Sequence, residues 1–452
     1  MSRQTKSTVK PPEIWRVWWS NPSAAFSVPL LLAGITAYMT DASAYATYWR
    51  TAKHFNLSSL GLLFGIAILF VAGCVIGAAR RDEGDREPAG DWRRGVRWES
   101  VRLLFQLSFA LTVLAYAVWF SIAIKNGLRL SVISDLIHGV AGGADSLRIE
   151  YLKTIPGVTT ATQFGIAVIG LGIPLGAATG WRGVRWRLVT VFALSVLRAF
   201  LNSERLAVIE LVVPFIVSFI WLCPPTGRRA RRMVQAAPFL GVGFLYVFFA
   251  VTEYFRSWAS FYATRESSYW GFIGLRLMGY YTTALNNGAL LYKVKNPLSF
   301  QLLPTTVDFI WRFPILSSLL PLISPYFRLS SAISGARYDA LLTASANPEL
   351  TNPSGAFGPI VDYGMIGGLL YWLLCGLICG YIYKECKQRT AAGIFLYPVL
   401  FISLIEASRV LYWAEGRFFA PMFLLVVGVL FVFPTRRAAP LYRPLQMDKV
   451  PG

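Results

Sequence analysis

Long apolar stretches separated by polar connections form the dominant pattern of this chain. Ten of them are candidates to cross about 30 Å of hydrocarbon. They cover residues 24–39, 58–79, 101–124, 164–180, 188–201, 206–222, 236–253, 357–383, 391–411 and 418–433, of which 188–201 is short for a span. The pattern predicts an all-α integral membrane protein with about ten transmembrane helices, folded as a single polytopic domain over residues 1–452.

One long interruption, residues 255–356, separates the seventh and eighth apolar stretches and is dense in Arg, Tyr, Trp and Asn. We expect it to be a large extracytoplasmic loop that contains short helices. Its Pro-broken apolar part, residues 298–323, is expected to lie along the membrane interface. This loop is where a membrane protein of this kind would handle a polar substrate.

Composition agrees with a chain whose solvent is mostly lipid, because 55% of the residues are hydrophobic and only 15% are charged. The net charge of +20 could indicate a nucleic-acid partner. The Lys and Arg residues, however, recur in short clusters between apolar stretches and do not gather on one basic face. We therefore expect no nucleic-acid binding and interpret the clusters as topology signals.

The basic clusters occupy every second connection. They lie in the N-terminal tail, at residues 80–97, 182–187, 228–232 and 384–389, and in the C-terminal tail. The positive-inside rule then predicts that both termini are cytoplasmic and that the long loop is periplasmic. Ala42-x-Ala44 resembles a signal-peptidase site, but the long preceding segment and Asp41 favour a retained anchor helix.

A dedicated metal centre is not expected, because the chain has only two histidines, His54 and His138. The five cysteines fall in apolar stretches or beside basic connections, so structural disulfides are not expected either. The phosphate-binding, serine-hydrolase and zinc-protease motifs of soluble enzymes are missing from the sequence.

Ionisable residues at the outer ends of the apolar stretches are the functional candidates, because such groups are costly at membrane depth. Arg198, Asn202, Glu204 and Arg205 lie between two short stretches with no Pro or Gly turn. Short helices would draw this corner below the headgroups into a cavity. In the alternative interpretation, Glu204 and Arg205 cap the next helix while Arg198 extends toward the headgroups.

A second group joins the last two stretches and consists of Glu406, Arg409, Glu415 and Arg417. Glu406 and Arg409 are three residues apart, so they share a helix face and could form a purely structural pair. A third candidate, Asp362, opens the eighth stretch. A buried aspartate needs a partner, and we expect an arginine from the loop or from the short helices.

Within the long loop, residues 269–287 predict a helix in which Arg276, Tyr280 and Asn287 lie on one stripe. Arginine suits a diphosphate because of its planar fork, and the faces of aromatic rings suit sugar rings. The alternative is that the aromatic residues form an interfacial belt and the arginines bind lipid phosphate.

Three segments resemble the O-antigen polymerase group, the Wzy-type oligosaccharide repeat-unit polymerases related to the O-antigen ligases. They are Asn202-Ser-Glu-Arg-Leu, the stretch from Arg276 to Asn287, and Asn352-Pro-Ser-Gly-Ala-Phe-Gly-Pro-Ile-Val-Asp-Tyr-Gly-Met-Ile-Gly-Gly. The sequence departs from two patterns of this group. Gly288 lies one residue too far from Arg276 for the Arg-x10-Gly spacing, and His138 lies in an earlier loop than the ligase histidine.

The resemblance implies a metal-independent glycosyltransferase without a cofactor, in the bacterial inner membrane. It would polymerise polyprenyl-diphosphate-linked oligosaccharides on the outer face for surface polysaccharides such as O-antigen or exopolysaccharide. Membrane lipids and a chain-length regulator are possible further partners. A ligase that passes finished glycan to another acceptor, a transporter or flippase of lipid-linked oligosaccharide, and a structural or receptor role are the alternatives.

The candidate roles follow from the chemistry of glycosyl transfer. Departure of a diphosphate builds negative charge that fixed arginines stabilise, and the acceptor hydroxyl needs a base. Glu204 and Asp362 are the candidate bases, with Glu204 first. The candidates for the diphosphate are Arg198, Arg205, Arg276, Arg409 and Arg417, and those for the glycan are Tyr280, Asn287 and Asn352.

Overall fold

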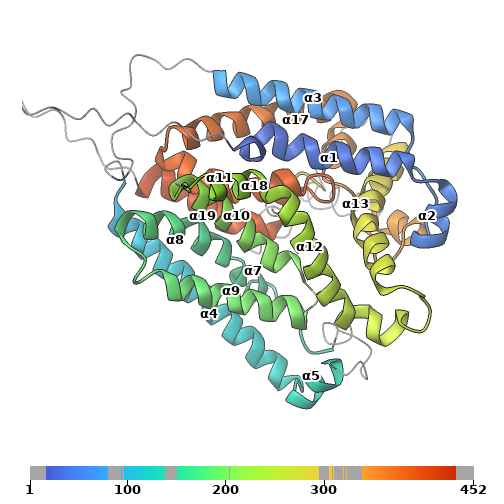
Figure 1. The fold of residues 1–452 in the computed structure, drawn as a ribbon, viewed down its shortest axis with the longest axis horizontal. Helices are drawn as coiled ribbons and strands as arrows, with labels where there is room; N and C mark the ends of the chain where they lie inside the picture. Colours follow the sequence, from blue (N-terminus) through green and yellow to red (C-terminus); the bar gives the residue numbers. More distant parts are fainter. Residues whose placement is uncertain are drawn as a thin grey trace, which may run out of the picture.

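The described part of the chain folds into helices and connecting segments (Figure 1). The computed structural model describes residues 17–79, 93, 96–137, 150–202, 204–225, 227–294, 305–307, 309, 319, 322 and 338–433. Within these ranges no β-strand occurs, so the all-α prediction is confirmed for them. The N-terminal tail, the C-terminal tail, His138, and most of residues 80–97 and 298–323 lie outside the described residues.

The principal helices are α1 (Pro22–Met39), α2 (Ala42–Trp49), α3 (Leu57–Ala79), α4 (Trp98–Lys125), α5 (Leu130–Ile137), α7 (Val158–Thr162), α8 (Gly165–Thr179), α9 (Arg185–Leu201), α10 (Leu206–Leu222), α11 (Arg228–Gln235), α12 (Ala237–Glu253), α13 (Tyr269–Val294), α17 (Gly358–Lys387), α18 (Ala391–Ile405) and α19 (Gly416–Val427). Short 3-10 helices lie at Trp18–Ser20 and Tyr412–Ala414, and π-helices η3 (Tyr254–Tyr262) and η5 (Gly428–Val432) extend α12 and α19.

Every predicted apolar stretch is helical over most of its length, and six helical segments in the described residues are long and apolar enough to cross a membrane. These are Pro22–Met39, Leu57–Ala79, Trp98–Lys125, Val158–Thr179, Ala237–Ala259 and Gly358–Lys387. The segments Leu206–Leu222, Ala391–Ile405 and Gly416–Val432 are apolar but shorter, and α9 has 17 residues. The fold is therefore consistent with a helical protein embedded in a membrane.

The prediction for residues 391–411 placed the helix end too late. Helix α18 ends at Ile405, and the chain then turns through hydrogen bonds from the Arg409 and Val410 backbone N–H groups to the Glu406 carbonyl. Apolarity continues past the end of the helix because Ala407 and Leu411 are buried in the turn. The hydrophobic pattern alone therefore did not reveal this boundary.

Helices α3 and α17 lie side by side at one edge of the bundle, with α1 packed against α3 (Figure 1). Their backbones touch at glycines. A Cβ atom added to Gly73 would lie 2.1 Å from the Leu373 carbonyl oxygen, and one added to Gly376 would lie 2.1 Å from the Phe70 carbonyl oxygen. This is the close approach that small residues at four-residue spacing permit between membrane helices.

Helix α8 forms the centre of the other half of the bundle, where it contacts α4, α9, α10, α18 and α19. All of its residues from Gly165 to Gly176 are buried. An apolar helix that is covered on every side belongs to the interior of a large helical protein. It provides a fixed support for the surrounding helices, whose ends form the site described below.

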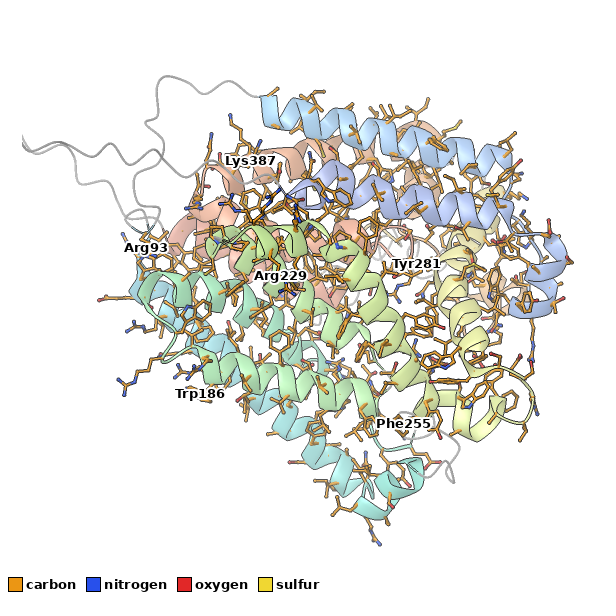
Figure 2. All side chains as sticks on the ribbon, viewed as in Figure 1. Arg93, Trp186, Arg229, Phe255, Tyr281 and Lys387 are labelled. Carbon is orange, nitrogen blue, oxygen red and sulfur yellow. The ribbon has the colours of Figure 1, made fainter. Side chains whose placement is uncertain are left out.

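The two ends of the bundle differ in charge. Basic residues lie at the starts of α9 and α11 and at the end of α17, and Arg93, Arg229 and Lys387 lie on the same side of the molecule (Figure 2). Phe255 and Tyr281 lie toward the other side (Figure 2). The α9–α10 and α18–α19 connections and the end of α12 all belong to this second end, which is called here the cavity end.

The long interruption contains the helix that the sequence predicted. Residues 269–287 are part of α13, which extends to Val294. The N-terminal part of the interruption is the π-helix η3, which continues α12 without a break. The helix prediction for this segment is confirmed, with an end several residues later than the predicted one.

Candidate functional site

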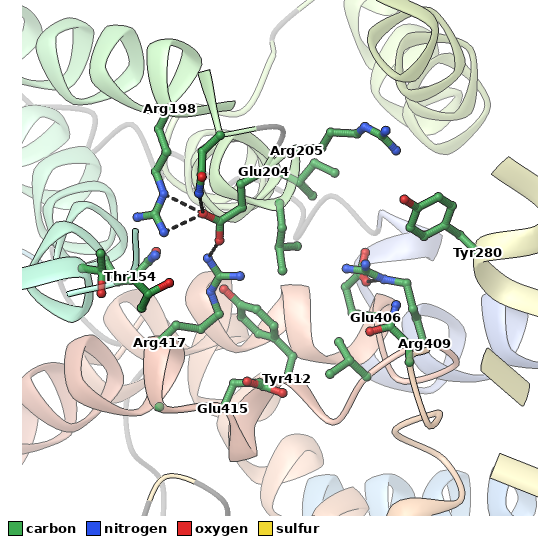
Figure 3. A pocket seen from close by; sticks show the side chains of 18 of the residues that line it. Thr154, Arg198, Glu204, Arg205, Tyr280, Glu406, Arg409, Tyr412, Glu415 and Arg417 are labelled. Atoms are coloured by element: carbon green, nitrogen blue, oxygen red, sulfur yellow. Dashed lines mark hydrogen bonds and ion pairs between the residues drawn. The ribbon is translucent and has the colours of Figure 1, made fainter. Parts of the chain in front are cut away.

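A cavity of about 580 Å³ opens at the cavity end of the bundle (Figure 3). Side chains from the α9–α10 connection, α12, η3, α13 and the α18–α19 connection line it. Its volume lies within the range that is typical of small-molecule sites. Its arginines are Arg198, Arg205, Arg256, Arg409 and Arg417.

Glu204 is held between two arginines on one side of the cavity. Arg198 Nη2 lies 2.6 Å from Glu204 Oε2, and Arg417 pairs with the other carboxylate oxygen (Figure 3). Arg198 lies in the last turn of α9 and Arg417 lies in the first turn of α19. The ion pairs of Glu204 therefore connect two distant parts of the chain. We call Arg198, Glu204, Glu210 and Arg417 the Glu204 cluster.

Glu210 completes this cluster from inside α10. Its carboxylate is buried, and Arg417 Nε lies 3.0 Å from its Oε1 atom. The Gln163 amide, oriented with its nitrogen toward Glu210, donates to Oε2 at 2.7 Å and accepts from Arg417 at 3.1 Å. Two arginines therefore face two carboxylates, which is the compensation that buried charges require.

The arginines also control the ionisation of Glu204. Burial raises the pKa of its carboxyl group, but the charges of Arg417 and Arg198 outweigh this effect and lower the pKa to about 2. Both carboxylate oxygens are already hydrogen-bonded. A base must be free to accept a proton. This geometry favours a structural and electrostatic role for Glu204 over the general-base role expected from the sequence.

Three arginines surround the Tyr280 hydroxyl on another side of the cavity. Arg256 Nη1 donates to this hydroxyl at 2.7 Å, and the guanidinium carbon of Arg205 lies 5.5 Å from the centre of the ring. Arg276, one helical turn before Tyr280 on α13, lies 2.6 Å from Glu253, which also pairs with Arg205. We call Arg205, Glu253, Arg256, Arg276 and Tyr280 the Tyr280 cluster.

Three arginines outnumber the one carboxylate of the Tyr280 cluster. Burial raises the pKa of the Tyr280 hydroxyl, yet the charges of the three arginines, Arg205 first, outweigh this effect and lower the pKa to about 8. This lowered pKa indicates that the position favours negative charge. The same preference would favour an anionic ligand.

Apolar side chains line the cavity next to the Tyr280 cluster. Leu245 and Phe249 come from α12 and Leu277 comes from α13, and the Arg205 guanidinium lies 3.8 Å from the centre of the Phe249 ring. The outer face of α12 exposes large apolar residues, among them Phe244 and Val247. A charged region and an apolar region therefore adjoin, beside a helix that would face the bilayer.

A separate ion pair lies in the cavity lining. Arg409 Nε lies 2.7 Å from Glu406 Oε2, so the predicted pair is confirmed, although it lies in the turn after α18 and not on a helix face. Both residues line the cavity. The pair therefore does not separate the structural interpretation from the functional one.

Seven of the ten residues predicted for the site line this cavity. They are Glu204, Arg198, Arg205, Arg409, Arg417, Tyr280 and Asn352. Arg276 is not a lining residue, but it belongs to the Tyr280 cluster and also pairs with Glu349. Asn287 does not line the cavity either, since its side-chain amide donates to the Leu350 and Asn352 carbonyls at 2.9 and 3.1 Å and so fixes the loop.

Asp362 lies outside the cavity lining and has a different kind of partner from the one expected. Its Oδ2 atom accepts from the Thr305 and Thr306 backbone N–H groups at 3.1 and 2.8 Å and from the Thr306 hydroxyl at 2.8 Å. Among the described residues its hydrogen-bond partners are these threonines and not an arginine. Two backbone N–H groups and a hydroxyl therefore take the place of a cation at one oxygen of this buried carboxylate.

Sequence reasoning missed several residues of the site. Glu210 interrupts an apolar stretch, and an ionisable residue at that depth was a usable signal. Arg256 lies in the π-helix η3, a helix type that is frequent at functional sites but that leaves no mark in the sequence. Gln163 and Glu253 carried no signal of their own, because their importance comes from the partners that the fold brings to them.

Within the part of the chain that the structure describes, no group of three or more His, Cys, Asp or Glu residues could hold a metal ion. Comparisons with protein-family models, with curated proteins and with solved structures give no match.

Proposed function

We propose that this protein is a membrane glycosyltransferase that polymerises polyprenyl-diphosphate-linked oligosaccharide repeat units into a surface polysaccharide. The observation that carries the proposal is the cavity, in which arginines from distant parts of the chain adjoin an apolar wall. Such a site suits an amphipathic anion, with a diphosphate between the arginines and a lipid chain leaving along apolar side chains.

The Tyr280 cluster is the proposed site of the diphosphate. Its three arginines outnumber its one carboxylate, they come from three elements, and Leu245 and Leu277 line the cavity beside it. When the glycan leaves its carrier, negative charge builds on the diphosphate. Preorganised arginines stabilise that charge in a site screened from water.

The membrane placement is part of the proposal. We propose that the ten helical stretches all span or enter a bacterial inner membrane, with the basic end in the cytoplasm and the cavity end on the periplasmic side. Lipid-linked repeat units would then meet the cavity in the outer leaflet. The short helices α9 and α10 support this placement, because they bring Glu204 below the level of longer neighbours such as α4.

The test is a transfer reaction with purified protein in lipid vesicles and a polyprenyl-diphosphate-linked repeat unit. A ladder of chain lengths supports polymerisation. A single transfer to another acceptor would instead indicate a ligase. Movement of the lipid-linked sugar across the vesicle without a new glycosidic bond would indicate a transporter, and both results would overturn the proposal.

Variants connect the reaction to the cavity. Arg205→Ala should lower kcat/KM by about 100-fold or more, which corresponds to the loss of one charged contact to a leaving diphosphate. Arg182→Ala is the matched control, because Arg182 is exposed at the basic end of the bundle. Equal activity of the two variants would exclude a role for the cavity in the reaction.

A further inference from the structure

Three glutamates line the cavity, and only one of them is available to accept a proton. Glu204 has both carboxylate oxygens occupied by arginines. Glu406 is 4% exposed and accepts from Arg409. Among the described residues, the side chain of Glu415 has no hydrogen-bond or ion-pair partner.

Glu415 is held in place by its backbone. It directly precedes α19, its N–H donates to the Tyr412 carbonyl at 3.1 Å, and its own carbonyl accepts from the Phe418 and Phe419 N–H groups. The side chain is half-buried and faces the cavity. A carboxylate with a fixed backbone, an open side chain and access to a cavity has the properties of a general base.

Threonine hydroxyl groups also line the cavity. Helix α19 contacts α7, the helix that carries Thr159 and Thr160, and Thr154 lies just before it. Figure 3 shows Thr154 and Glu415 on the side of the view opposite to Tyr280. This part of the cavity lies away from the proposed diphosphate site and presents groups that hydrogen-bond to sugar hydroxyls.

We propose that Glu415 and the threonines of the α7 region form the acceptor-sugar subsite, in which Glu415 is the catalytic base. This inference rests on the proposed function. The Glu415 carboxylate takes the proton of the acceptor hydroxyl while the acceptor oxygen bonds to the anomeric carbon. The bond from that carbon to the diphosphate oxygen breaks, its electron pair leaves on the diphosphate, and Glu415 then releases the proton to water.

The arrangement assigns separate tasks to the two sides of the cavity. Arginines of the Tyr280 cluster hold the donor and Glu415 activates the acceptor, while the Glu204 cluster has its charges compensated. A polymerase needs two such places, because one repeat unit leaves its carrier while another receives it. A single subsite would serve only one of these substrates.

The decisive experiment measures transfer and donor binding in the same preparations. Glu415→Gln should lower kcat by about 100-fold to 10,000-fold, which is the range for loss of a general base. Binding of glycan-free undecaprenyl diphosphate should stay within about twofold of the wild type. Arg205→Ala should instead act mainly on binding and weaken the affinity for this probe.

The pH profile separates a base from a structural residue. If the wild-type kcat falls at low pH, this acid limb should be missing from the residual activity of Glu415→Gln. Glu415→Asp should recover part of kcat. Glu266→Gln is the control, because Glu266 is an exposed glutamate outside the cavity.

The outcomes are distinguishable. If Glu415→Gln retains more than about a third of wild-type kcat, or keeps the acid limb, the base assignment is overturned while the polymerase proposal stands. If the wild type forms no glycosidic bond, the proposed function itself fails. If Glu415→Gln loses probe binding, the test is made with Glu415→Asp. A Glu415→Asp variant that binds the probe, loses kcat completely and keeps the wild-type acid limb contradicts the assignment of Glu415 as the base.

Discussion

At the scale of single residues, the ionisation of the acidic side chains in the site depends on which arginines lie beside them. Glu204 and Tyr280 are both acids beside arginines, and the pKa of each is lowered, to about 2 and about 8. These two lowered pKa values have different consequences. Glu204 is ionised at neutral pH and compensates its neighbours, whereas Tyr280 is mostly neutral at that pH and adds no negative charge to the three arginines around it.

Replacement of Glu204 should therefore destabilise the protein. Glu204→Gln leaves Arg198 and Arg417 facing Glu210 alone, and we expect a loss of about 2 to 3 kcal/mol, below the full cost of breaking a buried pair because the side chain is 21% exposed. Thermal unfolding in detergent at a fixed scan rate measures this loss. Glu415→Gln is the matched control, and an equal decrease in both variants would contradict the charge-compensation argument.

The contribution of Glu204 to stability should depend on pH in a defined direction. Its pKa in the folded protein, about 2, is lower than the ordinary value of 4.5. The stabilisation is therefore complete above about pH 4.5 and is lost as the pH falls through 2. The difference in thermal midpoint between the wild type and Glu204→Gln should shrink across this window, and a constant difference down to pH 2 would argue against the ion pairs.

Tyr280 should make donor binding sensitive to alkaline pH. Above pH 8 its hydroxyl loses a proton, and the phenolate then competes with a diphosphate for the arginines. Affinity for undecaprenyl diphosphate should fall by up to about tenfold per pH unit above 8, because binding requires proton uptake. Tyr280→Phe keeps the ring and removes the proton, so its affinity should change less over the same range. Parallel profiles would show that Tyr280 does not titrate there.

At the scale of elements, helix length and glycine spacing decide how the bundle is assembled. The apolar pattern revealed where helices form, since each predicted stretch contains one. It failed at the end of α18, where Ala407 and Leu411 are buried in a turn. Sequence periodicity reports burial, and a buried turn resembles a buried helix in this respect. The π-helix at Arg256 was invisible for a similar reason, because its residues are ordinary.

The contact between α3 and α17 gives a prediction at this scale. In Gly376→Ala the added methyl would lie 2.1 Å from the Phe70 carbonyl oxygen, so the helices must separate. We expect a loss of about 2 kcal/mol or more, since packing holds membrane helices together without a hydrophobic drive between them. The thermal midpoint in detergent measures it.

Gly61→Ala provides the control on the same helix pair. Gly61 lies on α3, and a Cβ atom added there meets no atom within 4 Å. Alanine costs less backbone entropy than glycine in a helix, so this variant should be neutral or slightly more stable. A similar decrease in both variants would mean that glycine is needed at α3 and α17 for some reason other than close packing.

At the scale of the whole molecule, the site could be predicted in part because charge is rare in this sequence. Arg198, Arg205, Arg409 and Arg417 were recognisable at the ends of apolar stretches, and the fold brings all of them to one cavity. Which carboxylate neutralises which arginine could not be predicted. The pairing of Arg417 with Glu204 joins residues 213 positions apart, and such contacts depend on how helices pack and not on local pattern.

The separation of charge between the two ends of the bundle makes the orientation testable. The positive-inside rule predicts that Arg229 and Lys387 are cytoplasmic and that the segment after η3, which contains Arg265, is outside. Single cysteines at these exposed or half-exposed positions should respond differently to a membrane-impermeant maleimide. On intact spheroplasts Arg265→Cys should be labelled, whereas Arg229→Cys and Lys387→Cys should react only after lysis.

The native protein sets the baseline for this experiment, since its own cysteines lie in helices or at the basic end and should react weakly from outside. The result bears directly on the proposed reaction. A cavity that opens to the periplasm can receive repeat units displayed in the outer leaflet, whereas a cavity that opens to the cytoplasm cannot. Labelling of Arg229→Cys in intact spheroplasts would invert the molecule and remove the polymerase proposal, even if every arginine contact in the cavity were correct.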